Sequence, residues 1–320
     1  MAVFTRRLPA LVAVAALAAA SAACSSSAAS PSSADSPSVA AKAGFPVTVT
    51  TAGGSVHLTS RPDAIVSLSP TATEMLYAVG AGSQVKAVDS YSDYPKQAPT
   101  TKLSAYDPNA EAIAAYKPDL VVISNNIDGI TAKLKALSIP VLDLPAAANV
   151  SDVYAEITEL GAATGHPAQA ATEDSKIKSA IKTIAASVPS HAKPVTYYYE
   201  LSTNPYYSVT SATFVGSLLS LLGMKSIADA AHGAAAAGGY PSLSAEYILK
   251  ANPDYIILAD TGSGGGQDAT TVSSRPGWSV LTAVKDKHII LLNTDIASRW
   301  GPRIVDLLRT VATALKSQSS

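Results

Sequence analysis

The chain has 320 residues, of which 48% are hydrophobic and 15% are charged, and its net charge is −1. This length and composition indicate a soluble protein of about two domains, each able to bury a core of ordinary size. No run of Lys and Arg is present, which argues against a nucleic-acid partner, since such a partner is bound through the release of counterions from its phosphates.

The first 23 residues predict a secretory signal peptide. A pair of Arg precedes a largely apolar stretch from Leu8 to about Ala20, and Cys24, the only Cys of the chain, follows small residues. The arrangement resembles a bacterial lipoprotein leader, in which the Cys becomes the lipidated N-terminus. It departs from that pattern at Ser21, where Leu is usual, so a plain secretory signal with a leftover thiol is the alternative. No other stretch is apolar over about 18 residues, so no transmembrane helix is expected.

Residues 24–44 are expected to form a lipidated Cys and a flexible tether. The segment is rich in Ser, Ala and Pro and holds too few large apolar residues to bury anything. Because no further Cys is present, the mature protein has to be stabilised by packing rather than by disulfides.

An α/β lobe is predicted over 45–165. Polar and apolar residues alternate around a pair of Gly at 45–58, which indicates a small hairpin. Strands and helices then alternate, and this order predicts helices packed on a sheet rather than an all-β fold. The expected strands cover 64–69, 85–90 and 140–144, and the expected helices cover about 70–79, 130–137 and 151–165.

The longest predicted helix lies between two such lobes. Residues 167–188 place Ala and Lys at helical spacing, with Pro167 at the start and Pro189 just beyond the end. At about 1.5 Å per residue it would span roughly 33 Å, about the width of a small domain. We therefore assign 166–189 to a helix that links the two lobes.

A second lobe is predicted over 190–320. Its expected elements are strands at 194–201, 206–210 and 288–293, and helices at about 213–222, near Trp278 and at 301–315. The Gly-rich stretch at 261–268 is not followed by Lys-Ser/Thr and opens no helix, so it indicates a surface loop rather than a phosphate-binding loop.

One segment occurs twice in the chain. The two copies are AEAIAAYKPDLVVI (110–123) and AEYILKANPDYIIL (245–258). Each predicts a short helix, a turn at Pro and a buried strand, and each places a Glu, Glu111 or Glu246, in the first turn of its helix, where the helix dipole favours a carboxylate. A unit repeated once, 135 positions apart, predicts two similar lobes and not a solenoid.

A family resemblance is carried by four features of the chain: SLSPTATEMLYAVGAGSQVKAVDSYSDYP (67–95), the first copy of the repeat, the single linking helix and NTDIASRWGPRI (293–304). Together they resemble the substrate-binding proteins of ABC importers for vitamin B12, ferric siderophores and haem, and SYSDYP (90–95) with the TD…R..PRI ending is most similar to the vitamin B12 binders. The resemblance covers essentially all of 60–315. It implies an α/β fold of two Rossmann-like lobes joined by a single long α-helix.

The resemblance also implies partners and a location. In this family a Glu on each lobe meets Arg residues of the two permease subunits, and Glu111 and Glu246 are the matching positions here. Pseudo-symmetric carboxylates suit a two-fold partner, although both residues could merely favour the helix dipole. The protein is expected to be a monomer on the outer face of the cell membrane, anchored through a lipid on Cys24.

The ligand is expected in the cleft between the lobes, where loops at the carboxyl ends of the strands meet. Six residues match positions that contact cobalamin in the B12-binding relatives: Tyr91, Tyr106, Tyr207, Tyr240, Asp295 and Arg299. Several of these positions hold Tyr where the relatives have Trp or Phe, and a partly buried packing role is the alternative for each Tyr. Tyr94 and Trp300 lie beside these motifs, and Glu74, three residues after Thr71, fits a capping box.

Charge separates the candidate ligands. The five His show no paired spacing, so neither a bound metal nor a cofactor is expected. A triscatecholate ferric siderophore would favour several Arg in the cleft, and only Arg275, Arg299 and Arg303 are candidates. A near-neutral corrinoid such as cobalamin fits better, with a hydroxamate-type ferric siderophore or haem as alternatives.

No catalytic function is expected. The chain has no G-x-S-x-G motif and no free Cys nucleophile in the mature protein, and no motif places a His beside Ser and Asp. A lipid-anchored adhesion module would not need two lobes around a cleft. The sequence therefore predicts an extracytoplasmic binding protein that is not an enzyme.

Overall fold

The computed structural model describes residues 44–190, 192–262 and 266–317. The predicted signal peptide, Cys24 and nearly all of the predicted tether lie outside the described residues. Within the described part of the chain, no helix is both long enough and apolar enough to cross a membrane.

The first lobe is built on a parallel sheet with the strand order β4-β3-β5-β6. The central strands β3 and β5 are buried along their whole length, which explains their continuous apolar sequences. The elements are β1 (Val47–Thr51), β2 (Gly54–Leu58), β3 (Ile65–Leu68), α1 (Pro70–Ala78), β4 (Val85–Val88), α2 (Ala110–Ala114), β5 (Leu120–Ile123), α3 (Ile130–Ala136) and β6 (Val141–Asp143), with short 3₁₀ helices at Gly82–Gln84 and Ile127–Gly129. The predicted hairpin at 45–58 is confirmed as the antiparallel pair β1 and β2.

Helix α4 (Val150–Thr164) closes the first lobe. Its N-terminus has a capping box, in which Asn149 accepts from the backbone N–H groups of Ser151 and Asp152 while the Asp152 side chain accepts from the Asn149 N–H. The helix ends at Gly165, whose φ of 79° lies in the left-handed region that favours glycine. The sequence therefore fixes both ends of this helix locally.

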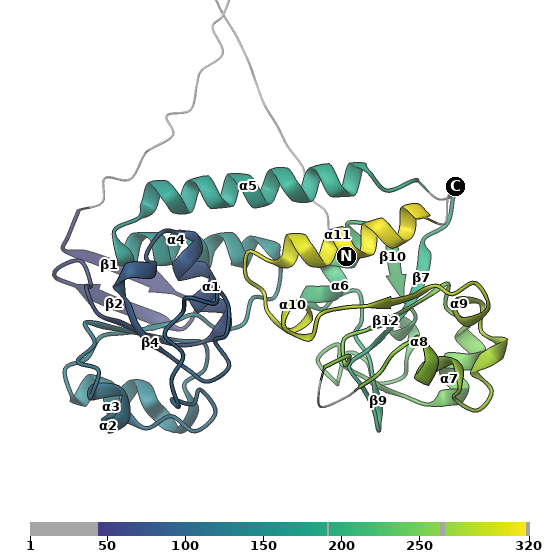
Figure 1. Ribbon diagram of the computed structural model, residues 1–320, viewed down its shortest axis with the longest axis horizontal. Helices are drawn as coiled ribbons and strands as arrows, with labels where there is room; N and C mark the ends of the chain where they lie inside the picture. Colours follow the sequence, from purple (N-terminus) through teal and green to yellow (C-terminus); the bar gives the residue numbers. More distant parts are fainter. Residues whose placement is uncertain (1–43, 191, 263–265, 318–320) are drawn as a thin grey trace, which may run out of the picture. The chain divides into compact units, whose positions relative to one another are not determined.

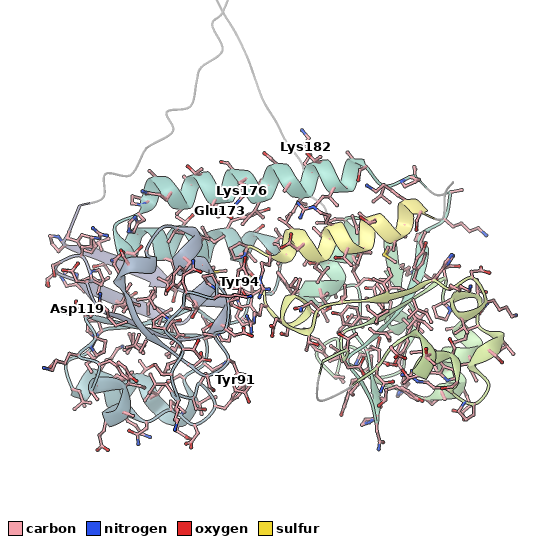
Figure 2. All side chains as sticks on the ribbon, viewed as in Figure 1. Tyr91, Tyr94, Asp119, Glu173, Lys176 and Lys182 are labelled. Carbon is pink, nitrogen blue, oxygen red and sulfur yellow. The ribbon has the colours of Figure 1, made fainter. Side chains whose placement is uncertain are left out.

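Helix α5 (Pro167–Ala186) joins the two lobes, as the resemblance implied. It packs against α4 and against the C-terminal helix α11 (Ile304–Ser317), and Figure 1 shows it extending over both. The contact with α4 is close, since a Cβ added at Gly161 would lie 2.4 Å from the Cβ of Ala170. In Figure 2, Lys182 projects from the face of α5 that points away from α11, and Glu173 and Lys176 form an ion pair of 3.1 Å along the helix.

The second lobe is built on a parallel sheet with the strand order β10-β7-β12-β13. Its elements are β7 (Val195–Glu200), β8 (Ser202–Thr203), β9 (Tyr206–Tyr207), α6 (Phe214–Ser220), β10 (Met224–Ser226), β11 (Ser242–Leu243), α7 (Ala245–Ala251), β12 (Tyr255–Leu258), α8 (Ala269–Ser273), α9 (Thr282–Lys285), β13 (Ile289–Leu291) and α10 (Thr294–Ser298), with 3₁₀ helices at Ile227–Ala230 and Trp278–Val280. The short strands β11, β9 and β8 form a small antiparallel sheet of their own.

Several predicted elements of the second lobe are shorter than expected, and two of them differ most clearly from the prediction. The strand predicted over 206–210 is the two-residue strand β9, and the closing helix begins at Ile304 instead of 301. The segment before Ile304 holds Gly301 and Pro302 in a turn, where Pro302 disfavours a helical conformation at Gly301, and Arg299 and Arg303 on either side pair with carboxylates, as described below.

The repeated segment forms the same unit in both lobes. Asn109 and Ser244 cap α2 and α7, accepting from the N–H groups of Ala112 (2.8 Å) and Tyr247 (3.1 Å) respectively. The Asp that follows each repeated Pro has a further role. Asp119 accepts from the N–H groups of Asp63 and Ala64 just before β3, and Asp254 accepts from the Thr196 N–H on β7. Each Asp thus fastens the strand of its repeat to the neighbouring central strand.

One buried carboxyl group of α4 contacts the second lobe. Glu156 is 6% exposed, and its Oε2 accepts from the Trp300 Nε1–H at 2.9 Å. Burial raises the pKa of Glu156 to about 8, against the lowering effect of the Trp300 hydrogen bond and with a further rise from Glu159 and Asp152. The carboxyl group is therefore largely protonated in the folded protein at neutral pH.

We predict that the ionisation of Glu156 lowers the free energy of unfolding as the pH rises. The folded state holds a proton that the unfolded state releases, so the free energy of unfolding falls from about pH 4.5 to about pH 8. Glu156→Gln keeps an acceptor for Trp300 but cannot ionise, so its stability advantage over the wild type should grow through that window. Denaturant titrations at several pH values measure this difference. Asp286→Asn, at an exposed position, is the control, and its difference in free energy of unfolding from the wild type should not change with pH. A pH-independent difference for Glu156→Gln would contradict the prediction.

Candidate functional site

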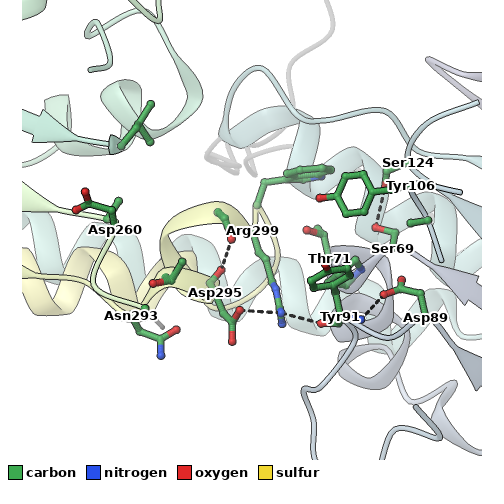
Figure 3. A pocket seen from close by; sticks show the side chains of 18 of the residues that line it. Ser69, Thr71, Asp89, Tyr91, Tyr106, Ser124, Asp260, Asn293, Asp295 and Arg299 are labelled. Carbon is green, nitrogen blue, oxygen red and sulfur yellow. Dashed lines mark hydrogen bonds and ion pairs between the residues drawn. The ribbon is translucent and has the colours of Figure 1, made fainter. Parts of the chain in front are cut away.

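A cleft of about 1130 Å³ lies at the carboxyl ends of strands from both sheets. On the first lobe it is lined by residues that follow β3, β4 and β5, and on the second lobe by residues that follow β7, β12 and β13 (Figure 3). The lining residues are Leu68–Thr71, Asp89, Tyr91, Ala105, Tyr106, Ser124 and Asn125 from the first lobe, and Leu201–Asn204, Ala259–Gly262, Asn293–Asp295 and Ser298–Trp300 from the second. The cleft thus lies where the sequence predicted the ligand site.

Two tyrosines form an aromatic pair on the wall of the first lobe. Tyr91 and Tyr106 meet edge to face, with ring centroids 5.7 Å apart and an interplanar angle of 89°. Both are open to solvent, with 59% of Tyr91 and 72% of Tyr106 exposed. Their large exposed area is unusual for aromatic side chains and is available to a ligand.

The carboxylate of Asp89 positions Tyr91. Asp89 is fully buried, and its Oδ1 accepts from the backbone N–H groups of Tyr91 (2.7 Å) and Ser92 (3.1 Å), while its Oδ2 accepts from the Ser92 hydroxyl. Burial raises the pKa of Asp89, and these hydrogen bonds oppose that rise. The carboxyl group holds the turn that presents the Tyr91 ring to the cleft.

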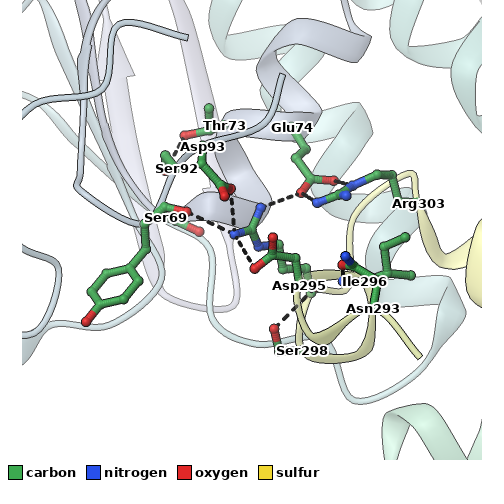
Figure 4. Close-up of polar contacts among 12 residues, drawn as sticks. Ser69, Thr73, Glu74, Ser92, Asp93, Asn293, Asp295, Ile296, Ser298 and Arg303 are labelled. Atoms are coloured by element: carbon green, nitrogen blue, oxygen red, sulfur yellow. Dashed lines mark hydrogen bonds and ion pairs between the residues drawn. The ribbon is translucent and has the colours of Figure 1, made fainter. Parts of the chain in front are cut away.

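Arg299 is the centre of a partly buried ionic cluster, and Figure 4 labels its partners Glu74, Asp93 and Asp295. Its Nη1 lies 3.0 Å from Glu74 Oε1, and its Nη2 lies 3.0 Å from both Asp93 Oδ1 and Asp295 Oδ1. Nη2 also donates to the Tyr91 carbonyl at 2.9 Å. Arg303 donates to Glu74 as well, through Nε at 2.8 Å. We call Glu74, Asp93, Asp295, Arg299 and Arg303 the Glu74 cluster.

The predicted capping box at Glu74 is wrong. The helix cap of α1 is Ser69, whose Oγ accepts from the Ala72 N–H at 3.2 Å. Glu74 is 4% exposed and binds two guanidinium groups of the second lobe instead. The expected spacing from Thr71 was present, but the partners that decide the role of Glu74 lie more than 220 positions away in the sequence.

Each Arg considered for an anionic ligand is already paired with a carboxylate. Arg299 and Arg303 bind Glu74, and Arg275 binds Glu200 through two contacts of 2.6 Å. Only Arg299 of these three lines the cleft, and it is 9% exposed. The cleft therefore offers little uncompensated positive charge among the described residues.

The structure brings together some of the predicted ligand-binding residues. Tyr91, Tyr106, Asp295, Arg299 and Trp300 all line the cleft. Three others lie elsewhere: Tyr207 on β9 and Tyr240 before β11 are exposed but do not line it, and Tyr94 stacks under Arg303, whose Cζ lies 4.1 Å from the ring centroid.

Two acidic residues that line the cleft, Asp89 and Asp260, were not predicted from the sequence. The available signal was their position, since each follows a short buried strand whose carboxyl end faces the cleft. Among the described residues, no group of three or more His, Cys, Asp and Glu side chains is arranged to hold a metal ion.

Glu111 and Glu246 lie on the surface at corresponding places of the two lobes. Each is exposed in the first turn of its short helix, α2 or α7. Hydrogen bonds to its own backbone N–H and to Ser244 lower the pKa of Glu246. Both carboxylates are thus accessible to a partner.

Comparison with known proteins identifies the family. The family model described as periplasmic binding protein matches residues 65–296. An uncharacterised ABC transporter substrate-binding lipoprotein of Bacillus subtilis is 32% identical over 281 residues, covering 85% of this chain and 86% of its own. The chain belongs to the periplasmic binding protein family, whose members bind substrates for transport and are not enzymes.

Two solved structures share the fold at similar identity. The periplasmic vitamin B12 binding protein of Vibrio cholerae is 27% identical with a TM-score of 0.63, covering 81% of this chain and 98% of its own. A possible iron-binding periplasmic protein from Staphylococcus epidermidis is 28% identical with a TM-score of 0.68, covering 80% of this chain and 99% of its own. The expected fold class of two α/β lobes joined by a long helix is confirmed.

We predict that Glu74→Gln destabilises the protein. The substitution keeps the shape of the side chain but removes the negative charge that two buried guanidinium groups share. Breaking a buried ion pair from one side lowers the free energy of unfolding by about 3–5 kcal/mol. Chemical denaturation measures this loss. Asp306→Asn, which breaks the exposed pair with Arg309, is the control and should change stability little; an equally small change for Glu74→Gln would refute the prediction.

Proposed function

We propose that this protein captures cobalamin or a related corrinoid in the cleft and delivers it to an ABC permease. The observation that carries the proposal is the cleft itself: it is large, it presents exposed aromatic faces, and its one lining Arg is already paired with carboxylates. These three properties together favour a bulky, near-neutral ligand.

The size of the cleft supports a bulky ligand. Sites for ordinary small molecules measure about 300–1,000 Å³, and this cleft of about 1130 Å³ is larger. It is also bounded by two separate walls, which suits a broad, flat molecule held between the lobes. A corrin ring is bulky, broad and flat.

The chemistry of the lining supports a macrocycle rimmed with amides. Tyr91 and Tyr106 offer ring faces for apolar contact and hydroxyl groups that both donate and accept. Ser69, Thr71 and Asn125 add further polar groups on the same wall. Amide side chains around a corrin both donate and accept hydrogen bonds, and so match this mixed surface.

Charge weighs against anionic ligands. Among the described residues that line the cleft, three are carboxylates, Asp89, Asp260 and Asp295, and one is a guanidinium, that of Arg299. A triscatecholate ferric siderophore, with about three negative charges, and haem, with its two propionates, would find little compensation there. A near-neutral or cationic ferric hydroxamate remains the second candidate, because the excess of carboxylates would suit it as well.

The similar proteins are consistent with both candidates. The Vibrio cholerae protein is named for vitamin B12, and the Staphylococcus epidermidis protein is described as possibly iron-binding. At 27% and 28% identity these names support the class of ligand for this chain without choosing between its members. The residues of the cleft are what favour the corrinoid.

We further propose membrane anchoring and docking as the sequence indicated. The Bacillus subtilis relative is named a lipoprotein, which supports a signal peptide over residues 1–23 and a lipid on Cys24. The exposure and matched placement of Glu111 and Glu246 support a role in contacting the two permease subunits. The protein would then act at the outer face of the cell membrane.

Calorimetric titration of the mature protein with cyanocobalamin tests the ligand. We expect saturable one-to-one binding, and we expect Tyr106→Ala to weaken it about tenfold, since an exposed aromatic contact of this kind is worth about 1.4 kcal/mol. Tyr116→Ala is the control, because Tyr116 is also exposed but does not line the cleft. If the folded protein gives no heat with cyanocobalamin, the corrinoid proposal fails, and ferric hydroxamates or haem become the candidate ligands.

Removal of both docking carboxylates tests the partner. We expect Glu111→Ala combined with Glu246→Ala to abolish ligand uptake in cells while leaving the affinity of the purified protein unchanged, because neither residue lines the cleft. Asp63→Ala combined with Asp286→Ala removes one exposed carboxylate from each lobe and should leave uptake intact. Normal uptake by the Glu variant, or a loss of its ligand affinity, would count against docking.

A further inference from the structure

Among the described carboxylates that line the cleft, only Asp260 has a buried oxygen without a hydrogen-bond partner. It follows β12 on the wall of the second lobe, across from Asp89 and Tyr106 of the first lobe (Figure 3). Its Oδ1 is buried and has no hydrogen-bond partner among the described residues. The other two lining carboxylates differ, since Asp89 accepts three hydrogen bonds and Asp295 pairs with Arg299.

The surroundings of Asp260 leave its charge uncompensated. The guanidinium of Arg275, whose charge acts on Asp260, lies 2.6 Å from both carboxylate oxygens of Glu200 and also 2.6 Å from Gln267 Oε1. Glu200 is fully buried, so it holds Arg275 firmly. Arg275 thus balances Glu200 and attracts Asp260 only weakly.

The pKa of Asp260 agrees with this geometry. Burial raises it to about 6, and repulsion from Glu200 adds to the rise, while a hydrogen bond from its own backbone N–H and the charge of Arg275 lower it. Near pH 7 the group is still mostly ionised. The wall of the cleft at the end of β12 therefore carries a negative charge that the described residues do not fully neutralise.

We propose that Asp260 determines which charge class of ligand the cleft accepts. It selects a ligand that turns N–H donors, as an amide or an ammonium group, toward the end of β12, and it rejects one that turns a carboxylate or another anion there. The reason is that a donor compensates the carboxylate, whereas a second anion in the same partly buried place is repelled.

This inference rests on the proposed binding function but not on the corrinoid in particular. For a corrinoid, the compensating donors would be amides on its rim. For a ferric hydroxamate, a free ammonium group would serve equally. Haem is disfavoured under either alternative if it presents its propionates to this wall.

The test compares ligands that differ only in one peripheral charge. Cyanocobalamin and its three monocarboxylic acid derivatives, each with one propionamide hydrolysed to a propionate, are titrated into the mature protein at low ionic strength. We expect at least one derivative to bind the wild type about tenfold more weakly than cyanocobalamin does, and we expect Asp260→Asn to bring that ratio to within about threefold. Asp286→Asn, an exposed carboxylate of the same lobe, should keep the wild-type ratio.

Folding of the variants is checked by thermal melting. Asp260→Asn removes a buried charge at nearly constant shape, so its melting temperature should equal or exceed that of the wild type. Asp260→Ser serves as a second variant and should relax the ratio in the same way. An unchanged ratio in both folded variants, or equal binding of all four ligands by the wild type, overturns the inference.

A second pair of ligands separates this inference from the corrinoid proposal. Ferrioxamine B carries a free ammonium group, and its N-succinyl derivative carries a carboxylate instead. If cyanocobalamin gives no heat but ferrioxamine B is preferred over its succinyl derivative in an Asp260-dependent way, the corrinoid proposal fails and the role of Asp260 stands. Tighter binding of haemin than of any amide or ammonium ligand contradicts the role of Asp260.

Discussion

The ionic contact between Glu74 and the two guanidinium groups of Arg299 and Arg303 is the constraint on which the cleft depends. A carboxylate on α1 of the first lobe meets two cations from the segment between α10 and α11 of the second. All three side chains are largely shielded from water, so their attraction is little screened. The same Arg299 binds the Tyr91 carbonyl. One cluster therefore fixes the second lobe against the first and holds the aromatic wall in place.

The distribution of charge around the cleft follows from this arrangement. The three guanidinium groups considered for an anionic ligand are paired within the protein instead. Arg299 and Arg303 pair with Glu74, and Arg275 pairs with Glu200. The carboxylates facing the ligand outnumber the guanidinium groups as a result. This arrangement supports the proposal of a ligand whose own polarity is spread over many neutral groups. Long helix α5, packed on α4 and α11, adds a second and independent connection between the lobes.

The repeated segment shows how one local sequence serves both structure and surface. Its Asp, Asp119 or Asp254, binds backbone N–H groups of the neighbouring central strand, so the Pro-Asp pair is explained by sheet assembly. Its Glu, Glu111 or Glu246, makes no comparable contact with the core and lies open to solvent. Packing alone does not explain the repeated Glu, and the two positions correspond between the lobes as a two-fold partner would require.

The sequence by itself determined the main strands and helices of both lobes and their order, because hydrophobic runs, helix caps and breaks at Pro or Gly act over a few residues. It also determined the family and placed Tyr91, Tyr106, Asp295 and Arg299 near one cleft. Only the tertiary structure decided the partners of those residues. Glu74 and Arg299 lie 225 positions apart, and no local pattern links them. Likewise, Tyr207 and Tyr240 were predicted to line the cleft but do not, whereas Asp260 lines it and was not predicted. Long-range packing sets which side chains meet.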